Sequence, residues 1–242
     1  MTRVAEVVII GNEILSGKVP DDNGPFLVRE LRELGVRLER ITVIPDHVPT
    51  IATTVAEASR RAVFVITTGG VGPTLDDLTF EGVAAAFQVP LRRFDEMAAI
   101  IEAFFKGKTT EAHMKMAQLP AESELVFSEG LLFPVVRVRN VYVFPGSPEL
   151  LRKKFLAVRE RFREAPFVLR RVFTRLEEGQ ISEALDRVHA AVPTVGIGSY
   201  PLLETSRYAV QITLESKDRS EVEKALHLLL SLLDPASIVS VD

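Results

Sequence analysis

The sequence contains neither cysteine nor tryptophan among its 242 residues. Without cysteine the chain can form no disulfide, no thiolate metal site and no thiol nucleophile, a composition that fits the reducing cytoplasm. Long apolar runs are also missing, since no stretch approaches the roughly 18 apolar residues that a membrane span requires. The N-terminal segment lacks the long apolar region of a signal peptide. We therefore expect a cytoplasmic protein with no membrane segment.

A strong charge of either sign is absent as well. The formal net charge is -4 and the isoelectric point is about 5.7, which argues against nucleic acid held by bulk electrostatics. Apolar residues make up 47% of the chain, and the mean hydropathy is +0.17. Such a chain can bury a substantial core, and its length suits one large domain or a medium and a small one.

Short apolar runs alternate with amphipathic segments in the first part of the chain. The runs predict buried strands over residues 4–10, 36–46 and 62–68. Between them apolar residues follow helical spacing, at Leu27, Leu31 and Leu34 and again at Ile51, Val55 and Ala58. Alternation of strands and helices at this spacing predicts crossover connections and a mostly parallel sheet.

The ends of several helices carry recognisable signals. Asn23 or Gly24 is expected to cap the first helix, with Pro25 at its first position and Gly35 ending it. Further along, residues 94–105 and 110–119 have helical patterns, and residues 124–128 and 138–146 have strand patterns. Ser147 and Pro148 then predict a cap and first position for a helix reaching residue 162.

After Pro166 the chain shows a second, separate succession of strand and helix patterns. Strand patterns lie at 167–176, 194–202, 208–216 and 237–241, and helical patterns lie at 182–192 and 220–233. The order strand, helix, strand, strand, helix, strand is that of a ferredoxin-like unit. We therefore predict two domains, residues 1–165 and residues 166–242, the second a small α/β domain.

Three polar clusters follow the first three predicted strands. They are Gly11, Asn12 and Glu13; then Asp46; and then the segment "TTGGVGPTLDDLTFE" from Thr67 to Glu81. In an open parallel sheet, ligands bind beyond the carboxyl ends of the strands. Because three such loops would converge at one edge, we interpret them together as a candidate site.

The third cluster combines glycines, which suit an anion, with carboxylates, which repel one. A divalent cation such as Mg²⁺, Mn²⁺ or Co²⁺ resolves this conflict, because it binds carboxylates and substrate phosphates together. The backbone of Gly69, Gly70 and Gly72 could approach phosphate oxygens. Asp77 or Asp46, or else Asp76, could hold the metal, and a helix starting near Thr79 would add its N-terminal dipole.

Each of these residues also has a purely structural interpretation. The glycine pair could form only a turn, and Asp77 and Thr79 could cap a helix, with Thr79 the better candidate. Asp46 could begin a helix, and Glu13 could accept amides of its own loop. Ser147 could be only a cap, although the amides after Gly146 could also bind an anion.

Several motifs then occur in an order that is specific. The segments "GNEILSG", "DDNGPFL", "VIPDHVPTI", "TTGGVGPTLDDLTFEGVA", "MKMAQLP" and "VYVFPGSPELL" together resemble the CinA-type (competence- or damage-inducible) family of molybdopterin-binding-like domains. This family is related to the MoaB, Mog and MoeA proteins of molybdenum-cofactor synthesis. The resemblance covers roughly residues 4 to 160. The later part, including "IGSYPLLETSRYAVQITLES", looks similar to the N-terminal half of animal FAD synthase.

The resemblance implies a three-layer α/β core of the MoaB/Mog type, followed by a small α/β domain that is described as KH-like in CinA. Asp77 falls on the acid that follows the glycine loop in Mog-type proteins, and Asp46 falls on their second acid, in a "PD" turn. Asn12 stands where relatives carry Asp. A role that needs negative charge at this position is therefore not expected here, although an amide can still bind a ligand.

The family resemblance implies more than one activity. Mog-type proteins bind or adenylylate molybdopterin with metal and ATP. CinA-type and FAD-synthase-type domains are associated with metal-dependent hydrolysis of nucleotide pyrophosphates such as ADP-ribose or FAD. We predict the second activity, with Asp77 and Asp46 as metal ligands, Asp76 as a further ligand or base, and Asn12 and Glu13 near the nucleoside. The alternatives are molybdopterin handling and a non-catalytic nucleotide or pterin sensor, and the family's habit of oligomerising suggests a homodimer.

Overall fold

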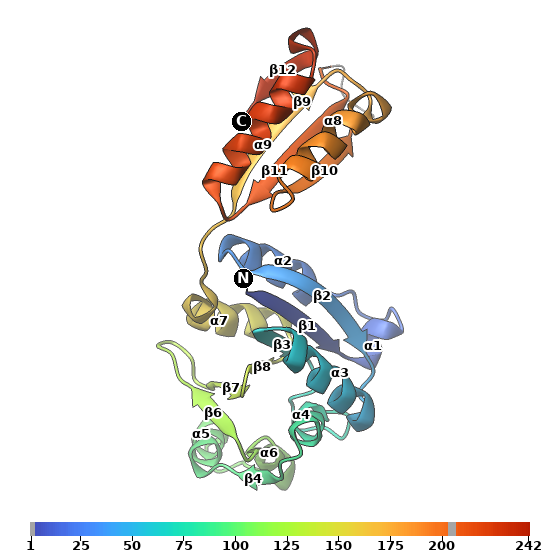
Figure 1. Ribbon diagram of the computed structural model, residues 1–242. Coiled ribbons are helices and arrows are strands. Elements are labelled where there is room, and N and C mark those ends of the chain that lie inside the picture. The colour runs from blue at the N-terminus through green and yellow to red at the C-terminus, as the bar shows by residue number, and fades with distance from the viewer. Residues whose placement is uncertain (1–2, 203–206) are drawn as a thin grey trace. The chain divides into compact units, whose positions relative to one another are not determined.

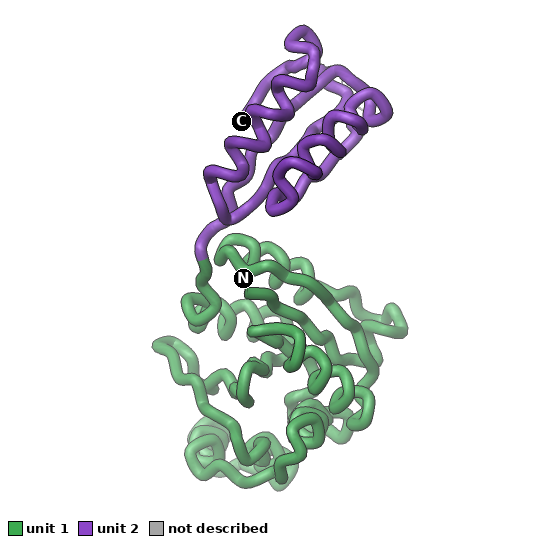
Figure 2. Tube along the Cα trace, in the orientation of Figure 1, with its two compact units in different colours: residues 1–164 green, residues 165–242 purple. Residues whose placement is uncertain are grey.

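The computed structural model describes residues 3–202 and 207–242 and divides the chain into two compact units. The first unit comprises residues 1–164 and the second comprises residues 165–242 (Figure 2). Each unit has its own hydrophobic core.

The first unit is built on a six-stranded, mostly parallel sheet (Figure 1). The strand order is β2-β1-β3-β8-β7-β6. The strands are β1 (Val4–Ile10), β2 (Arg37–Ile44), β3 (Phe64–Thr68), β6 (Ser123–Val126), β7 (Val135–Val138) and β8 (Val141–Phe144). Neighbouring strands from β2 to β8 run parallel, while β7 and β6 add an antiparallel edge. The predicted mostly parallel sheet is confirmed.

Helices cover both faces of this sheet. They are α1 (Asn12–Leu15), α2 (Asn23–Glu33), α3 (Val48–Arg61), α4 (Thr79–Phe87), α5 (Asp95–Phe105), α6 (Glu111–Lys115), α7 (Pro148–Val158) and the 3₁₀ turn η1 (Arg159–Phe162). A small second sheet pairs β4 (Leu91–Arg93) with β5 (Gln118–Pro120). The core residues of α2 and α7 lie in one cluster and those of α3, α4 and α5 in another. The unit therefore has the three layers that the family resemblance implies.

Strand β1 shows why its apolar run is unbroken. Ala5, Val7 and Ile9 belong to the cluster with α2 and α7, whereas Val8 and Ile10 belong to the cluster with α3. A strand buried on both faces needs apolar residues at successive positions rather than at alternate ones. The strand therefore lies in the middle of the three layers.

One charged residue, Glu6, interrupts this apolar strand. Its side chain is only 4% exposed. Arg61 at the end of α3 donates from Nε and Nη2 to the two carboxylate oxygens, at 2.8 and 2.9 Å. This two-point contact compensates the buried charge, because a planar guanidinium matches the geometry of a carboxylate.

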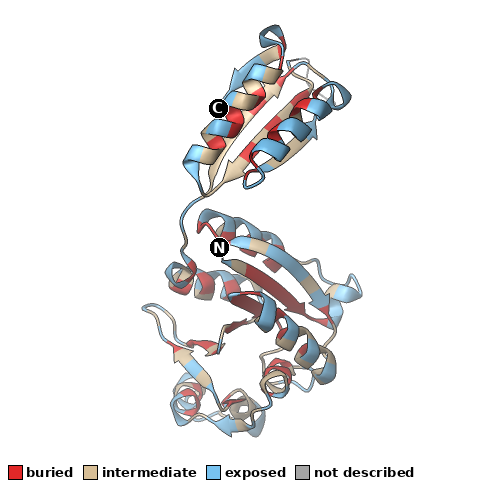
Figure 3. Ribbon diagram, viewed as in Figure 1, coloured by how far each residue is buried: buried red, intermediate tan, exposed pale blue. Residues whose placement is uncertain are grey.

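The second unit is a four-stranded antiparallel sheet with two helices. Its elements are β9 (Val168–Thr174), α8 (Glu178–Ala191), β10 (Gly196–Pro201), β11 (Val210–Ser216), α9 (Arg219–Leu232), the turn η2 (Pro235–Ser237) and β12 (Ile238–Val241). The strand order is β10-β11-β9-β12, which is the ferredoxin-like arrangement expected from the order of elements. Both helices lie on one face of the sheet (Figures 1 and 3), where the buried residues gather.

Three local predictions were wrong. Helix α2 starts at Asn23, so Pro25 is its third residue and Asp22 occupies the cap position without a side-chain cap bond. The amides of Asn23 and Gly24 donate instead to Asp21 Oδ1, at 2.9 and 3.0 Å. An acidic side chain just before the helix therefore replaces the expected cap.

The other two errors concern segments that change structure partway. Residues 138–146 are not one strand, because Arg139, with a φ of 54°, turns the chain between β7 and β8. Residues 110–119 are not one helix, because α6 ends at Lys115 and β5 follows. By contrast, Gly35 follows the last residue of α2 and its cap with a φ of 74°, as a helix-ending glycine should.

Candidate functional site

Four loops meet at one edge of the six-stranded sheet. Strands β2, β1, β3 and β8 are adjacent and parallel, so their carboxyl ends lie at the same edge. Gly11, Asp46, Gly69 and Gly146 follow these strands within two residues. The three polar clusters predicted from the sequence therefore lie at the same edge, joined by the loop after β8.

Asp46 links the first three of these loops. Its Oδ2 accepts a hydrogen bond of 2.8 Å from the backbone amide of Asn12. On its other side lies Gly70, where an added Cβ atom would be 3.5 Å from Asp46 Oδ1. A carboxylate thus lies between the loop after β1 and the glycine loop, and one of its oxygens holds the first loop.

The glycine pair after β3 has a conformation that other residues rarely adopt. The φ angles are 104° at Gly69 and 60° at Gly70. A Cβ atom on Gly69 would lie 2.0 Å from the carbonyl oxygen of Ile10, and one on Gly146 would lie 3.2 Å from the Cα of Gly69. The glycines therefore allow the backbones of three loops to approach one another closely.

Thr79 holds the glycine pair in place. Its side chain is fully buried, its hydroxyl donates to the carbonyl of Gly69 at 2.7 Å, and its amide donates to the carbonyl of Gly70 at 3.0 Å. Helix α4 starts at Thr79, as expected, but the alternative that Thr79 caps this helix does not hold, because Leu78 occupies the cap position. The threonine fixes the loop rather than the helix end.

Asp77 and Asp76 both contact Thr74 in the following turn. Asp77 Oδ2 accepts from the amide of Thr74 at 2.8 Å and also from its hydroxyl. The hydroxyl of Thr74 lies 2.6 Å from Asp76 Oδ1, and this hydrogen bond holds the pKa of Asp76 below its usual value. A Cβ atom on Gly72 would lie 2.7 Å from Asp77 Oδ2, so the third glycine leaves room for this carboxylate.

Lys115 of α6 holds the turn from Thr74 to Asp77 through hydrogen bonds. The sequence analysis did not identify this residue. Its Nζ donates to the backbone carbonyls of Asp77 and Thr74, at 2.9 and 3.2 Å, and lies 3.4 Å from Glu81 Oε1. The only sequence signal for it is its place in the segment "MKMAQLP". The lysine therefore fixes the backbone that presents the predicted metal ligand.

Asn23 was also missed, although it joins two strand ends beneath the site. The residue is 6% exposed, and its Nδ2 donates to Thr68 Oγ1 at 3.0 Å and to the carbonyl of Gly146 at 2.8 Å. The hydroxyl of Thr68 in turn donates to the carbonyl of Pro145 at 2.9 Å. This buried network ties β3 to the loop after β8.

Glu13 and Ser147 are exposed at the same edge. The carboxylate of Glu13 folds over Gly11, where an added Cβ atom would be 2.6 Å from Oε1. Ser147 precedes α7 with Pro148 as first helical residue, as predicted, but its hydroxyl makes no cap bond. Both side chains are therefore accessible to a ligand.

Asp46 and Asp77 are the carboxylates of this edge that were predicted to bind a metal ion. Among the described residues there is no group of three or more His, Asp or Glu side chains that could hold an ion. Asp46 and Asp77 each use Oδ2 within the protein, while Oδ1 of each accepts no hydrogen bond from the described residues. Two carboxylates fit a cation that completes its coordination with water and substrate phosphates.

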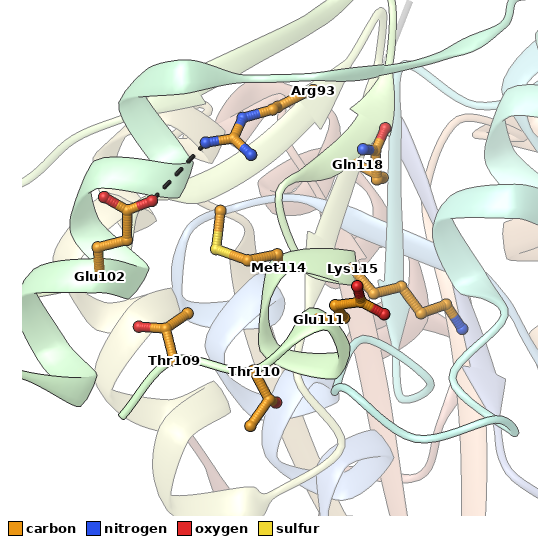
Figure 4. Close-up of a pocket in the computed structure, with 8 residues that line it drawn as sticks. All are labelled: Arg93, Glu102, Thr109, Thr110, Glu111, Met114, Lys115 and Gln118. Carbon is orange, nitrogen blue, oxygen red and sulfur yellow. Dashed lines mark ion pairs between the residues drawn. The ribbon is translucent and has the colours of Figure 1, made fainter. Parts of the chain in front are cut away.

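A pocket of about 580 Å³ lies beside α6 (Figure 4). Its lining residues are Arg93, Glu102, Thr109, Thr110, Glu111, Met114, Lys115 and Gln118. None of the predicted site residues lines it. In Figure 4 the ammonium group of Lys115 points away from the other lining side chains, so this pocket borders the candidate site without being part of it.

No helix in the described part of the chain is long and apolar enough to cross a membrane. The first unit is an α/β domain whose candidate ligand site consists of glycine and acidic loops at the carboxyl ends of its strands. Residues 6–163 match the family described as "Probable molybdopterin binding domain", and residues 166–242 match "FAD synthase, middle domain". The chain belongs to the family of probable molybdopterin-binding domains, and its second unit is similar to the FAD-synthase middle domain.

Known relatives extend over both units. A protein of Archaeoglobus fulgidus is 34% identical over 94% of this chain and 97% of its own length. A probable FAD synthase of Caenorhabditis briggsae is 33% identical over 99% of this chain, and a CinA-like protein of Frankia casuarinae is 30% identical over 90% of it. The chain spans 51% and 55% of the lengths of these last two relatives.

A solved structure supports the same family. The crystal structure of the protein CinA from Thermoplasma acidophilum superposes with a TM-score of 0.61 at 27% identity, covering 67% of this chain and 100% of that one. The resemblance to CinA-type proteins and FAD synthase that the motifs predicted is therefore confirmed.

Proposed function

We propose that this chain hydrolyses the diphosphate bond of a nucleotide such as ADP-ribose or FAD, with a divalent metal. One observation carries the proposal: Asp46 contacts the loop after β1 through Asn12 and borders the glycine loop at Gly70. A glycine backbone that can approach phosphate oxygens therefore lies directly beside a carboxylate that can hold their counter-ion.

The residues at the carboxyl ends of the strands would contact different parts of the substrate. Gly69, Gly70 and Gly72 would bring backbone close to the diphosphate. The exposed residue Ser147 lies at the start of α7, where an anion is favoured.

Asp46 and Asp77 would hold Mg²⁺, Mn²⁺ or Co²⁺ through Oδ1. When bound, such an ion lowers the pKa of a water molecule and offsets charge on the phosphates. Asp46 keeps the first loop attached while it presents its free oxygen.

Asp76 has a narrower role than a general base. The hydrogen bond from Thr74 lowers the pKa of this carboxyl, and a weaker base accepts a proton less readily at neutral pH. We therefore assign Asp76 as a further contact for the metal or its water shell. Asn12 and Glu13, at the exposed loop after β1, are assigned to the nucleoside side of the substrate.

Molybdopterin handling is the second candidate, because residues 6–163 match a family described as molybdopterin-binding. The same glycines and acids would serve a pterin phosphate. A molybdopterin-handling protein would transfer AMP to the pterin or would only bind the pterin. A hydrolase instead releases AMP into solution.

An AMP-release assay distinguishes these functions. Purified protein is offered FAD, ADP-ribose and NAD with Mg²⁺, Mn²⁺ or Co²⁺, and EDTA serves as the metal-free control. We expect metal-dependent AMP from at least one of the three. Folded protein that releases no AMP from any of them would contradict hydrolysis and favour pterin handling.

A further inference from the structure

The second unit has a sheet face that its two helices leave open. Helices α8 and α9 pack on one face (Figures 1 and 3), and Arg170 of β9 reaches Glu223 of α9 at 2.6 Å. Because side chains alternate along a strand, the neighbours of Arg170 point to the opposite face. Within the described part of this unit, no element packs on that opposite face.

Aromatic and polar side chains form one row across the open face. Phe173 of β9 pairs with Gln211 of β11, and Gln211 pairs with Tyr200 of β10. The two aromatic residues are therefore two strands apart, roughly 10 Å. Tyr208 adds a third ring, whose centroid lies 4.8 Å from that of Phe173.

The ring of Tyr200 is available for stacking. A Cβ atom on Gly198 would lie 2.8 Å from both Cε2 and the hydroxyl of Tyr200, so the ring leans back along the strand over the glycine. The residue is nevertheless 54% exposed. A ring supported from below by backbone and open above is a platform on which another flat ring can stack.

A cation lies one row further along this face. Arg171 pairs with Thr213, which pairs with Gly198 beneath the ring of Tyr200. The guanidinium of Arg171 has no ion-pair or hydrogen-bond partner among the described residues, in contrast to Arg170 beside it. A free guanidinium beside a stacking ring suits the phosphate of a ligand whose ring lies on the tyrosine.

We propose that this open face, here called the β-platform (Phe173, Tyr200, Gln211, Arg171 and Thr213), binds a small phosphorylated ligand with a flat heteroaromatic ring. Tyr200 stacks on the ring, the amide of Gln211 meets its polar edge, and Arg171 binds the phosphate. The site is distinct from the loops of the first unit and does not depend on the hydrolytic activity proposed for them.

The charges favour a small ligand over a polymer or a second copy of the chain. Acidic residues outnumber Lys and Arg in residues 165–242, whereas a nucleic-acid strand requires a basic stripe along its path. A stable interface between copies would bury Arg171, Gln211 and Thr213 at its centre, where charged residues are normally depleted. The ring of Tyr200 and the guanidinium of Arg171 are the groups that such a ligand would contact.

FMN is a suitable probe, because it carries a flavin ring and one phosphate and has no diphosphate bond to hydrolyse. Titration of the full chain in EDTA, followed by quenching of flavin fluorescence, reports ring stacking without the metal that the first unit would need. We expect Tyr200→Ala to weaken FMN binding about tenfold, the loss of one stacked ring, and Tyr200→Phe to retain it. Arg171→Gln should weaken FMN binding and leave riboflavin binding unchanged.

Matched variants distinguish FMN bound at the β-platform from FMN bound elsewhere on the chain. Phe104→Ala removes a similarly exposed ring from the first unit and should change nothing, and Asp77→Asn should also keep FMN binding. The proposal is overturned if wild type does not bind FMN, or if Tyr200→Ala binds it equally well. It is also overturned if single-stranded DNA binds in place of FMN, or if Tyr200→Ala turns a dimer into a monomer in gel filtration.

Discussion

Lys115 and Asp77 lie 38 positions apart in the sequence, and the ammonium group of the lysine donates a 2.9 Å hydrogen bond to the backbone carbonyl of the aspartate. The same group contacts Thr74 and Glu81. The turn that presents Asp77 is thus held by a charge outside the loop. Removing this charge should affect the position of the aspartate more than the fold.

Lys115→Met tests this relationship. We expect the kcat/KM of AMP release to fall about tenfold, the effect of losing roughly 1.4 kcal/mol of transition-state positioning. The thermal stability should change little, because Met keeps the aliphatic part of the side chain and none of the residues that the ammonium group contacts is buried. Lys108→Met, at an exposed lysine on the preceding loop, is the control. Equal kcat/KM for both variants would show that Lys115 does not position the turn.

Asp46→Asn separates charge from hydrogen bonding at the junction of the loops. The amide oxygen can still accept from the amide of Asn12, so the melting temperature should stay close to that of wild type. The lost charge should weaken metal activation by more than about tenfold, because hard divalent cations depend on carboxylate ligands. The Mn²⁺ concentration that gives half-maximal AMP release measures this. An unchanged value would exclude Asp46 as a ligand.

Arg61→Ala should destabilise the first unit by leaving Glu6 buried and unpaired. Loss of one partner destabilises most when the remaining charge is buried, as Glu6 is, and the loss here should be smaller than for a fully buried pair because Arg61 is 39% exposed. Glu6→Leu combined with Arg61→Met should recover most of the loss, since the strand is otherwise apolar. Urea unfolding measures both. A loss below about 1 kcal/mol for Arg61→Ala would mean that water already screens the pair.

Lys154 of α7 predicts a specific pH dependence of stability. Burial lowers the pKa of its ammonium group from 10.5 to about 8, although Nζ donates to the carbonyl of Pro134 at 2.8 Å. Between these two pKa values the unfolded chain binds a proton that the folded chain does not. The free energy of unfolding should therefore rise with pH across this window, by about 3 kcal/mol in total, and stay constant for this group below it.

Lys154→Met should remove this rise. Urea unfolding of both proteins at several pH values between about 7.5 and 9.5 gives the difference in slope, which cancels groups that titrate equally in the two. Parallel stability curves would show that Lys154 keeps an ordinary pKa in the folded state.

Much of the fold follows from local patterns. Strand β1 was predictable because a strand that is buried on both faces needs a continuous apolar run. The order of strands and helices in the second unit was predictable because strands buried on one face alternate apolar and polar residues. The break at Arg139 was not predictable, because a non-glycine residue with a φ of 54° gives no turn signal in the sequence. The start of α2 was misplaced for a related reason, since Asp21 replaces the usual cap through its hydrogen bonds to two amides.

The candidate site was predictable only in part. Its glycines and acids stand out in the sequence because each follows a strand. Lys115 and Asn23 do not, since their roles depend on contacts with residues 38 and 123 positions away. Such contacts exist only after the sheet has brought the loops together. The same holds for Thr79, whose hydroxyl could have capped the helix by sequence and instead donates to the carbonyl of Gly69.

The most direct test of the central proposal is the rate of Mn²⁺-dependent AMP release by wild type and Asp77→Asn. Asparagine keeps an oxygen for the amide of Thr74 and removes only the charge, and Asp95→Asn on the exposed surface of α5 serves as control. We predict metal-dependent release by wild type and the control, and a loss of about a hundredfold or more in Asp77→Asn. Release by Asp77→Asn at the wild-type rate would contradict the assignment of the glycine–acid loop as the catalytic site.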